Sequence, residues 1–253
     1  MFMNNAWYVA AWSREVGRSL LARRICDKPM VFYRKEDGTA VALEDLCCHR
    51  MLPLSHGHLA GDNLVCGYHG LTYDGTGACV RVPSQDFVPS SAKVAAYPVT
   101  EAHRFLWVWV GEPALADPKL VPDLHWNNDE NWAGDGEVMF AHCDYRLLID
   151  NLLDLTHETF VHSSSIGDHR LPSAPIEVAS DEDTVTVSRW ILDHPPAPFW
   201  AHFIKVARGY EGNCDRWQIA RFVAPCSVNI DVGVAEALPT VTVAPDGCAP
   251  AAG

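Results

Sequence analysis

The first part of the chain, residues 22–110, consists of short apolar segments separated by turn sequences. Residues 35–38 and 74–77 combine charged residues with glycine, a pattern that ends an extended segment and lets the chain reverse. The β-rich segments between such turns are residues 30–34, 41–46, 64–66, 71–73, 78–82, 94–99 and 105–110. This length and spacing predict a small β-sandwich or barrel.

The second part of the chain combines a helical pattern with alternating segments. Residues 145–161 lack glycine and proline, and leucines recur at helical spacing at Leu148, Leu152 and Leu155. Residues 198–208 begin with proline, which suits the first turn of a helix. Strands are predicted at residues 174–179, 184–192, 216–222 and 228–235. Because few connections resemble βαβ crossovers, we predict an antiparallel sheet covered by helices.

The boundary between the two parts is marked by prolines. Residues 111–123 contain three of them, which is typical of a linker. We therefore predict two domains, residues 1–112 and 113–253. The predicted fold class is α+β, with an all-β N-terminal domain followed by a domain in which helices cover an antiparallel sheet.

Composition and charge limit the partners of the protein. The hydrophobic content of 48%, with 9 Trp and 9 Phe, is sufficient for real cores. The net charge of −13 disfavours nucleic acid and an anionic membrane as partners. No apolar run approaches a membrane span, and no secretory signal is recognisable. The 9 cysteines are an odd number, so complete internal disulfide pairing is excluded, and we expect a cytoplasmic protein.

Two pairs of cysteine and histidine are the candidate metal ligands of the first part. One residue separates Cys47 from His49, and two residues separate Cys66 from His69. A zinc finger usually pairs Cys with Cys and His with His along the chain. In a Rieske [2Fe–2S] centre two Cys bind one iron and two His bind the other, so each mixed pair reaches both irons. The pattern favours the cluster, and zinc is the alternative. Cys48 is a further thiol that could compete for iron or oxidise.

A second set of polar residues lies in the predicted helix. Asn151, Asp154 and His157 are three residues apart, so they share one helix face. His162 lies five residues beyond His157, which places it about 140° away around an ideal helix. For both imidazoles to bind one ion, the helix must end, bend or contain a π-bulge. The alternative is a polar helix face whose histidines only form hydrogen bonds, because short motifs also match by chance.

Together these motifs resemble the Rieske non-haem iron oxygenases, and in particular the vanillate O-demethylase branch of that family. The resemblance covers positions 2 to about 236. Its strongest segments are residues 47–50, 66–71 and 143–159, supported by residues 5–10, 107–111, 116–118, 196–200 and 215–219. One departure is Cys48, which stands where the family usually has proline.

The resemblance implies a cofactor set and roles for individual residues. It implies a [2Fe–2S] cluster held by Cys47, His49, Cys66 and His69. It also implies a mononuclear Fe(II) bound by His157 and His162, with a carboxylate completing the facial triad. Asp154 would link the cluster histidine of a neighbouring subunit to an iron-ligand histidine. The resemblance also implies a ring of three subunits. We count Asp154 and Asn151 as the candidate catalytic residues.

The activity that the resemblance implies is oxidative O-demethylation. A methoxybenzoate such as vanillate would react with O₂ to give a phenol and formaldehyde. Electrons would come from a separate NAD(P)H-dependent flavin and ferredoxin-type reductase, because the chain lacks a glycine-rich nucleotide loop of its own. The alternatives are an electron-carrying Rieske protein with an inactive catalytic domain, and a zinc-stabilised binding protein.

The end of the chain leads to an expectation about the iron. In this family the carboxylate ligand comes from a later helix, and the resemblance ends before such a helix. Residues 239–253 are instead rich in alanine and proline. We therefore expect a shortened oxygenase subunit that assembles the cluster, holds iron weakly through His157 and His162, and demethylates poorly or not at all. A nearby acid or a water that completes the site is the alternative.

Overall fold

The computed structural model describes residues 2–168 and 171–237, and the chain divides into two compact units, Met1–Val138 and Met139–Gly253. Residues 113–138 belong to the first unit. There Trp7 Nε1 donates a hydrogen bond to the Asp117 carbonyl at 2.8 Å, and Arg14 pairs with Asp135 at 3.0 Å. The predicted boundary between residues 112 and 113 separates functional domains, which are distinct from these compact units, and it stays a prediction.

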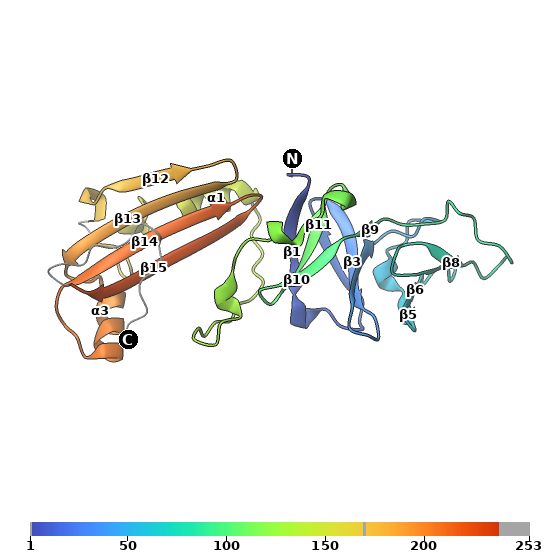
Figure 1. Ribbon diagram of the computed structural model, residues 1–253, viewed down its shortest axis with the longest axis horizontal. Helices are drawn as coiled ribbons and strands as arrows, with labels where there is room; N and C mark the ends of the chain where they lie inside the picture. Colours follow the sequence, from blue (N-terminus) through green and yellow to red (C-terminus); the bar gives the residue numbers. More distant parts are fainter. Residues whose placement is uncertain (1, 169–170, 238–253) are drawn as a thin grey trace. The chain divides into compact units, whose positions relative to one another are not determined.

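Three antiparallel sheets make up the first unit, as predicted for an all-β domain (Figure 1). The first sheet has the order β1-β11-β10 and contains β1 (Ala6–Trp12), β10 (Val99–Ala102) and β11 (Phe105–Val110). The second has the order β2-β3-β4-β9 and contains β2 (Leu21–Ile25), β3 (Lys28–Arg34), β4 (Ala40–Glu44) and β9 (Ala96–Tyr97). The third has the order β5-β6-β7-β8 and contains β5 (His58–Ala60), β6 (Asn63–Val65), β7 (Thr72–Tyr73) and β8 (Cys79–Arg81).

Strand β11 is buried on both faces. Leu106 and Val108 belong to one hydrophobic cluster, whereas Trp107 and Trp109 belong to another on the opposite face. Side chains alternate between the two faces of a strand, so this apolar run fills two cores at once. The ring centroids of Trp7 and Trp109 are 5.3 Å apart in an edge-to-face arrangement, which joins β1 to β11 through side chains as well as backbone.

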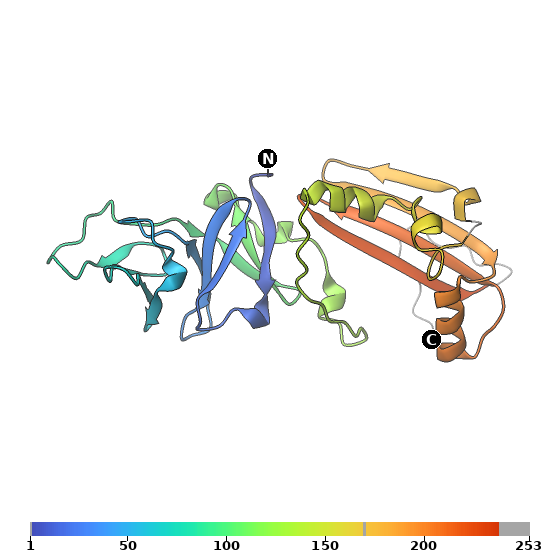
Figure 2. The ribbon, with the colours of Figure 1, turned by 180° about the vertical axis from the view of Figure 1, so that it is seen from behind.

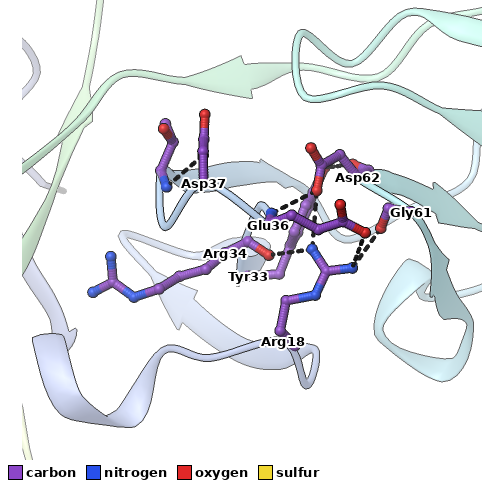
Figure 3. A network of polar contacts seen from close by, with 8 residues as sticks. Arg18, Tyr33, Arg34, Glu36, Asp37, Gly61 and Asp62 are labelled. Atoms are coloured by element: carbon purple, nitrogen blue, oxygen red, sulfur yellow. Dashed lines mark hydrogen bonds and ion pairs between the residues drawn. The ribbon is translucent and has the colours of Figure 1, made fainter.

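A polar network attaches the third sheet to the second (Figure 3). Arg18 donates to Asp62 Oδ1 at 2.9 Å and to the Gly61 carbonyl at 2.6 Å, both in the turn between β5 and β6. The same guanidinium donates to the Arg34 carbonyl at the end of β3 at 3.1 Å, and the Tyr33 hydroxyl donates to the Asp62 carbonyl at 3.3 Å. The β5–β6 hairpin is therefore fixed to β3 by several directed bonds.

In the described part of the second unit, a four-stranded antiparallel sheet with the order β12-β13-β14-β15 lies together with three α-helices. The strands are β12 (Ile176–Ser180), β13 (Thr184–His194), β14 (Cys214–Val223) and β15 (Ser227–Glu236). The helices are α1 (Tyr145–Leu153), α2 (Glu158–Val161) and α3 (Pro198–Arg208). Helix α1 packs against β14 and β15 on one face of the sheet (Figure 2). The predicted fold class is confirmed.

Helix α3 has the bounds that the sequence predicts, but the helix predicted over residues 145–161 is wrong in extent. Helix α1 ends at Leu153, and Asp154 is its C-cap residue. Asp154 Oδ1 accepts hydrogen bonds from the backbone amide and the hydroxyl of Thr156 at 2.7 and 2.5 Å. This local bonding gives the backbone an alternative to the helix, so the chain breaks before α2 begins. None of the described helices is long and apolar enough to cross a bilayer.

Candidate functional site

The two loops that carry the predicted cluster ligands have the same backbone design. The amide of Cys47 and the amide of Cys66 each donate to the carbonyl five residues later, at 2.9 and 2.8 Å. Each cysteine carbonyl accepts from the amide four residues later, at 2.9 and 3.0 Å. That fourth residue is left-handed in both loops, Met51 with φ 57° and Gly70 with φ 72°. A left-handed methionine costs about 1–2 kcal/mol, so the loop bonds must offset that strain.

The thiols and imidazoles of these loops are sorted by burial. Cys47 and Cys66 are each 2% exposed, whereas His49 and His69 lie at the surface. The two imidazole ring centroids are 4.6 Å apart. Burial raises the pKa of the Cys66 thiol, with the neighbouring Cys47 adding to the shift. A metal deprotonates a bound thiol outright, so bound iron would overcome this burial effect. Two adjacent buried sulfurs beside two adjacent exposed imidazoles fit a Rieske cluster.

Tyr73 is a fully buried residue next to the sulfur ligands that the sequence analysis did not single out. Its hydroxyl lies 3.2 Å from the Sγ atoms of both Cys47 and Cys48, and it accepts a bond from the Cys48 amide at 3.3 Å. A metal-bound Cys47 thiolate can only accept, so the Tyr73 hydroxyl would donate to it. The Cys48 thiol would then donate to Tyr73. Cys48 is exposed, whereas Cys47 is buried.

Two further contacts fix the loops in place. Asp45 is 5% exposed and accepts hydrogen bonds from the amide and hydroxyl of Ser55 at 2.6 and 2.7 Å. The loops also approach backbone to backbone at two glycines. A Cβ added to Gly57 would lie 2.0 Å from the Val65 carbonyl oxygen, and one added to Gly67 would lie 2.7 Å from the His56 carbonyl oxygen. Only glycine permits this separation of the loops.

The predicted iron ligands lie at the two ends of helix α2. His157 is its N-cap residue and His162 its C-cap residue, and their ring centroids are 5.3 Å apart. The sequence analysis required the helix to end, bend or bulge if both imidazoles were to meet. Helix α1 ends before His157, and α2 is a single turn of 4 residues that stops at Val161. Helical geometry ends at His162, whose φ of −114° and ψ of 26° leave the helix, and this end lets the two rings lie near each other.

Asp154 is oriented towards one of these histidines. Asp154 Oδ1 accepts a hydrogen bond from the Thr156 amide. Asp154 Oδ2 lies 3.7 Å from His157 Nδ1, an ion-pair distance that is too long for a hydrogen bond. The Thr156 hydrogen bonds hold the pKa of the Asp154 carboxyl below its usual range. His157 Nδ1 is buried without a hydrogen-bond partner. With Nδ1 facing the carboxylate, the other ring nitrogen is the one available to a metal. Asn151 is exposed on α1.

The donor sets agree with the chemistry of the two expected metals. Among the described residues, no group of three or more His, Cys, Asp or Glu side chains gathers around one point. Each iron of a Rieske cluster takes only two protein ligands, so two matched pairs are the set required. For a mononuclear ion the described residues offer two imidazoles, His157 and His162. These two imidazoles fit two of the three positions of a facial triad. The third ligand, a carboxylate, stays a prediction.

The sequence analysis missed a buried polar cluster beneath α2. Glu158, Arg189, Arg216 and Gln218 are each at most 5% exposed. In the sequence, Arg216 and Gln218 alternate with Trp217 and Ile219, and a charged residue in such a pattern is normally assigned to the solvent face. Glu158 stands between two predicted metal ligands in the sequence, but no local pattern identifies the strand that it contacts.

Two family models match the chain. The Rieske [2Fe-2S] domain matches residues 6–98, and the vanillate O-demethylase oxygenase C-terminal domain matches residues 141–248. The first match contains both cysteine–histidine loops, and the second contains the segment with His157 and His162.

Individual proteins agree with the family models. The vanillate O-demethylase oxygenase subunit of Pseudomonas sp. (strain HR199 / DSM 7063) is 44% identical over 239 residues, covering 94% of this chain and 67% of that protein. The toluene-4-sulfonate monooxygenase system iron-sulfur subunit of Comamonas testosteroni is 37% identical, covering 98% and 70%. A crystal structure of dicamba monooxygenase bound to 3,6-dichlorosalicylic acid has a TM-score of 0.86 at 35% identity, covering 94% and 69%.

The comparisons also bear on the cofactors and on the length of the chain. A Rieske domain implies a [2Fe–2S] cluster, and a dicamba monooxygenase structure with non-haem iron supports Fe(II) as the second cofactor. The chain spans about two thirds of the length of these relatives. On the family models and the identities together, the chain belongs to the Rieske non-haem iron oxygenases, as an oxygenase subunit of the vanillate O-demethylase type.

Proposed function

We propose that this protein removes the O-methyl group of a methoxybenzoate such as vanillate. The observation that carries the proposal is the combination of two metal-binding patterns in one chain, the paired cysteine–histidine loops and the adjacent His157 and His162. The 44% identity to a vanillate O-demethylase oxygenase subunit supports the choice of substrate. In this proposal residues 1–112 receive electrons, and residues 113–253 hold the iron.

The proposed reaction balances with O₂ and two electrons. One oxygen atom enters a C–H bond of the methyl group, and the resulting hemiacetal separates into a phenol and formaldehyde. The other oxygen atom leaves as water, with two protons taken up. When bound, the [2Fe–2S] cluster and Fe(II) supply electron transfer and O₂ activation.

The residues of this chain have separate tasks in the proposal. Cys47 and Cys66 hold the cluster from its buried side, and His49 and His69 hold it at the surface, where a redox partner can reach it. His157 and His162 hold the iron. Asp154 keeps His157 in one orientation through its free carboxylate oxygen. We assign Asn151 to the same site because it precedes Asp154 by three residues, although it lies on the exposed side of α1.

The proposal includes partners outside the chain. A separate NAD(P)H-dependent reductase with flavin and ferredoxin-type centres supplies the electrons, and its nucleotide substrate is consistent with work in the cytoplasm. We also propose a homotrimer in which Asp154 of one subunit serves the cluster of the next. The solvent-exposed Asp154 carboxylate and the exposed cluster histidines support this arrangement, because each is accessible from outside its own unit.

One assay separates the proposed oxygenase from an electron carrier. The holoprotein is mixed with reductase, NADH and vanillate, and formaldehyde and NADH consumption are measured together. An oxygenase releases about one formaldehyde for each NADH consumed. A carrier with an inactive second unit becomes reduced, which bleaches the cluster spectrum, but releases no formaldehyde. That second result would remove the proposed activity from this protein.

A further inference from the structure

Glu158 is a buried carboxylate inside the predicted iron-binding segment. It directly follows His157, opens helix α2 and is 5% exposed. A charged group taken out of water is strongly unfavourable unless other groups pair with it. The hydrogen-bond partners of the Glu158 carboxylate therefore indicate the role of this residue.

Both carboxylate oxygens of Glu158 are held by strand β14. Arg216 Nη2 donates to Oε1 at 2.7 Å, and Gln218 Nε2 donates to Oε2 at 2.5 Å. Arg216 and Gln218 are two residues apart, so they project from the same face of the strand. Each oxygen has its own donor, and this fixes the plane of the carboxylate as well as its position.

The same strand face holds the chain before and after α2. Arg189 Nη2 donates to the Leu155 carbonyl at 2.7 Å, and Arg216 Nη1 donates to the Ile166 carbonyl at 2.8 Å. Arg189 on β13 is directly opposite Gln218 on β14 in the sheet register. The segment is therefore attached to the sheet at its beginning, at Glu158 and at its end.

These attachments matter because α2 cannot hold itself in place. A helix of one turn has almost no intrinsic stability in water. Its backbone provides a bond from the His162 amide to the Glu158 carbonyl at 3.0 Å, and the Gly167 amide bonds to the His162 carbonyl at 2.9 Å. The position of the turn relative to the rest of the unit comes from the side-chain bonds to the sheet.

We propose that Glu158, clamped by Arg216 and Gln218, is a positioning residue that sets the separation of His157 and His162 and so the affinity for the mononuclear metal. Glu158 points to the sheet while the two histidines flank it along the chain. It acts through them and does not touch the metal. The inference rests on the proposed function, because it takes the two histidines as the ligands.

The test compares Glu158→Gln with the parent protein, both with the cluster intact and the mononuclear metal removed. The amide keeps the shape but removes the negative charge that pairs with Arg216. Anaerobic equilibrium dialysis against Fe(II) gives the affinity, which we expect to fall roughly 10- to 100-fold. The EPR signal of the nitric oxide adduct of the bound Fe(II) reports its geometry, and we expect it to broaden or shift. Glu177→Gln, an exposed glutamate on β12, is the matched control and should change neither.

A rescue variant separates positioning from general stability. Glu158→Gln combined with Gln218→Glu exchanges the carboxylate and the amide between positions 158 and 218, so a carboxylate is still present beside Arg216. We expect Fe(II) affinity and the EPR line shape to recover towards those of the parent. If Glu158→Gln does not fold, Gln218→Met is measured in its place, with the same criterion.

His157→Ala shows which idea fails if the expected result is not seen. If His157→Ala weakens Fe(II) binding and Glu158→Gln leaves it within twofold of the parent, the positioning role is wrong and the ligand assignment stands. If neither variant changes Fe(II) binding, the ligand assignment is wrong and the inference falls with it. A lower melting temperature of metal-free Glu158→Gln with unchanged affinity also counts against positioning.

Discussion

The two candidate metal sites are built in different ways. In the first unit each cluster loop closes on itself through backbone bonds between residues four and five positions apart. In the second unit a single helical turn carries both histidines, and side chains 50 to 60 positions away in sequence hold it and the chain after it. The first site is specified by its own loops. The second depends on the sheet beneath it. A substitution within a cluster loop should therefore affect the cluster directly, whereas a substitution on strand β14 should affect iron binding at a distance.

The largest expected effect is the loss of a cluster ligand. His69→Ala or His49→Ala removes one of the two proposed nitrogen ligands, so the purified variant should lose the Rieske absorption and EPR spectrum completely. Because each loop closes through its own backbone, the first unit should remain folded by circular dichroism. An unchanged spectrum in either variant would exclude that histidine as a ligand.

The next effect tests the link between the sites. Asp154→Asn keeps the shape of the side chain and its Thr156 contacts but removes the charge facing His157. We expect both metals to be retained and turnover to fall by roughly 10- to 100-fold, because a carboxylate partner orients its histidine. Stopped-flow reoxidation of the reduced cluster, together with iron analysis, measures this. Normal reoxidation at full iron content would contradict the role of Asp154.

A smaller effect concerns the tuning of the cluster. Tyr73→Phe removes the hydroxyl 3.2 Å from Cys47 Sγ, and hydrogen bonds to ligand sulfurs raise the reduction potential. We expect a midpoint potential lower by on the order of tens of millivolts, with the cluster retained. Cys48→Pro is the comparison variant, because it removes the Cys48 amide and thiol contacts of Tyr73 but keeps the hydroxyl next to Cys47, and it should also retain the cluster. Cluster loss in Cys48→Pro would show that Cys48, and not Cys47, is the ligand.

The smallest effect is an acid dependence of the first unit alone. Arg34 on β3 binds both oxygens of Glu101 on β10 and holds the pKa of that carboxyl below its ordinary value of 4.5. A lowered acid pKa stabilises the fold above the ordinary value, and this stabilisation is lost as pH falls below 4.5. Because Glu101 is partly exposed, its share is at most about 1 kcal/mol. Chemical denaturation of Glu101→Gln should show a smaller drop in stability between pH 6 and pH 4 than the parent.

The sequence was informative where structure is local. The strands β3, β4, β6, β7, β8, β9 and β11, the bounds of α3 and the spacing of the cysteine–histidine loops all depend on residues close together in the chain. The strands β1, β2, β5 and β10 were not predicted. The break between α1 and α2 was missed because helical periodicity in Leu148, Leu152 and Leu155 outweighed the capping chemistry of Asp154 and Thr156. The Glu158 cluster was missed for a different reason, since its partners lie on another strand and no local pattern identifies them.

The glycine contact between the cluster loops has a consequence for engineering the protein. Gly57 and Gly67 leave no room for a side chain between the loops, so they act as a fixed spacer for the two halves of the cluster. A library designed to vary the redox properties should keep both glycines. Diversity belongs at the exposed positions of the same loops, such as Cys48, Arg50 and Tyr68, where side chains change without moving the backbone.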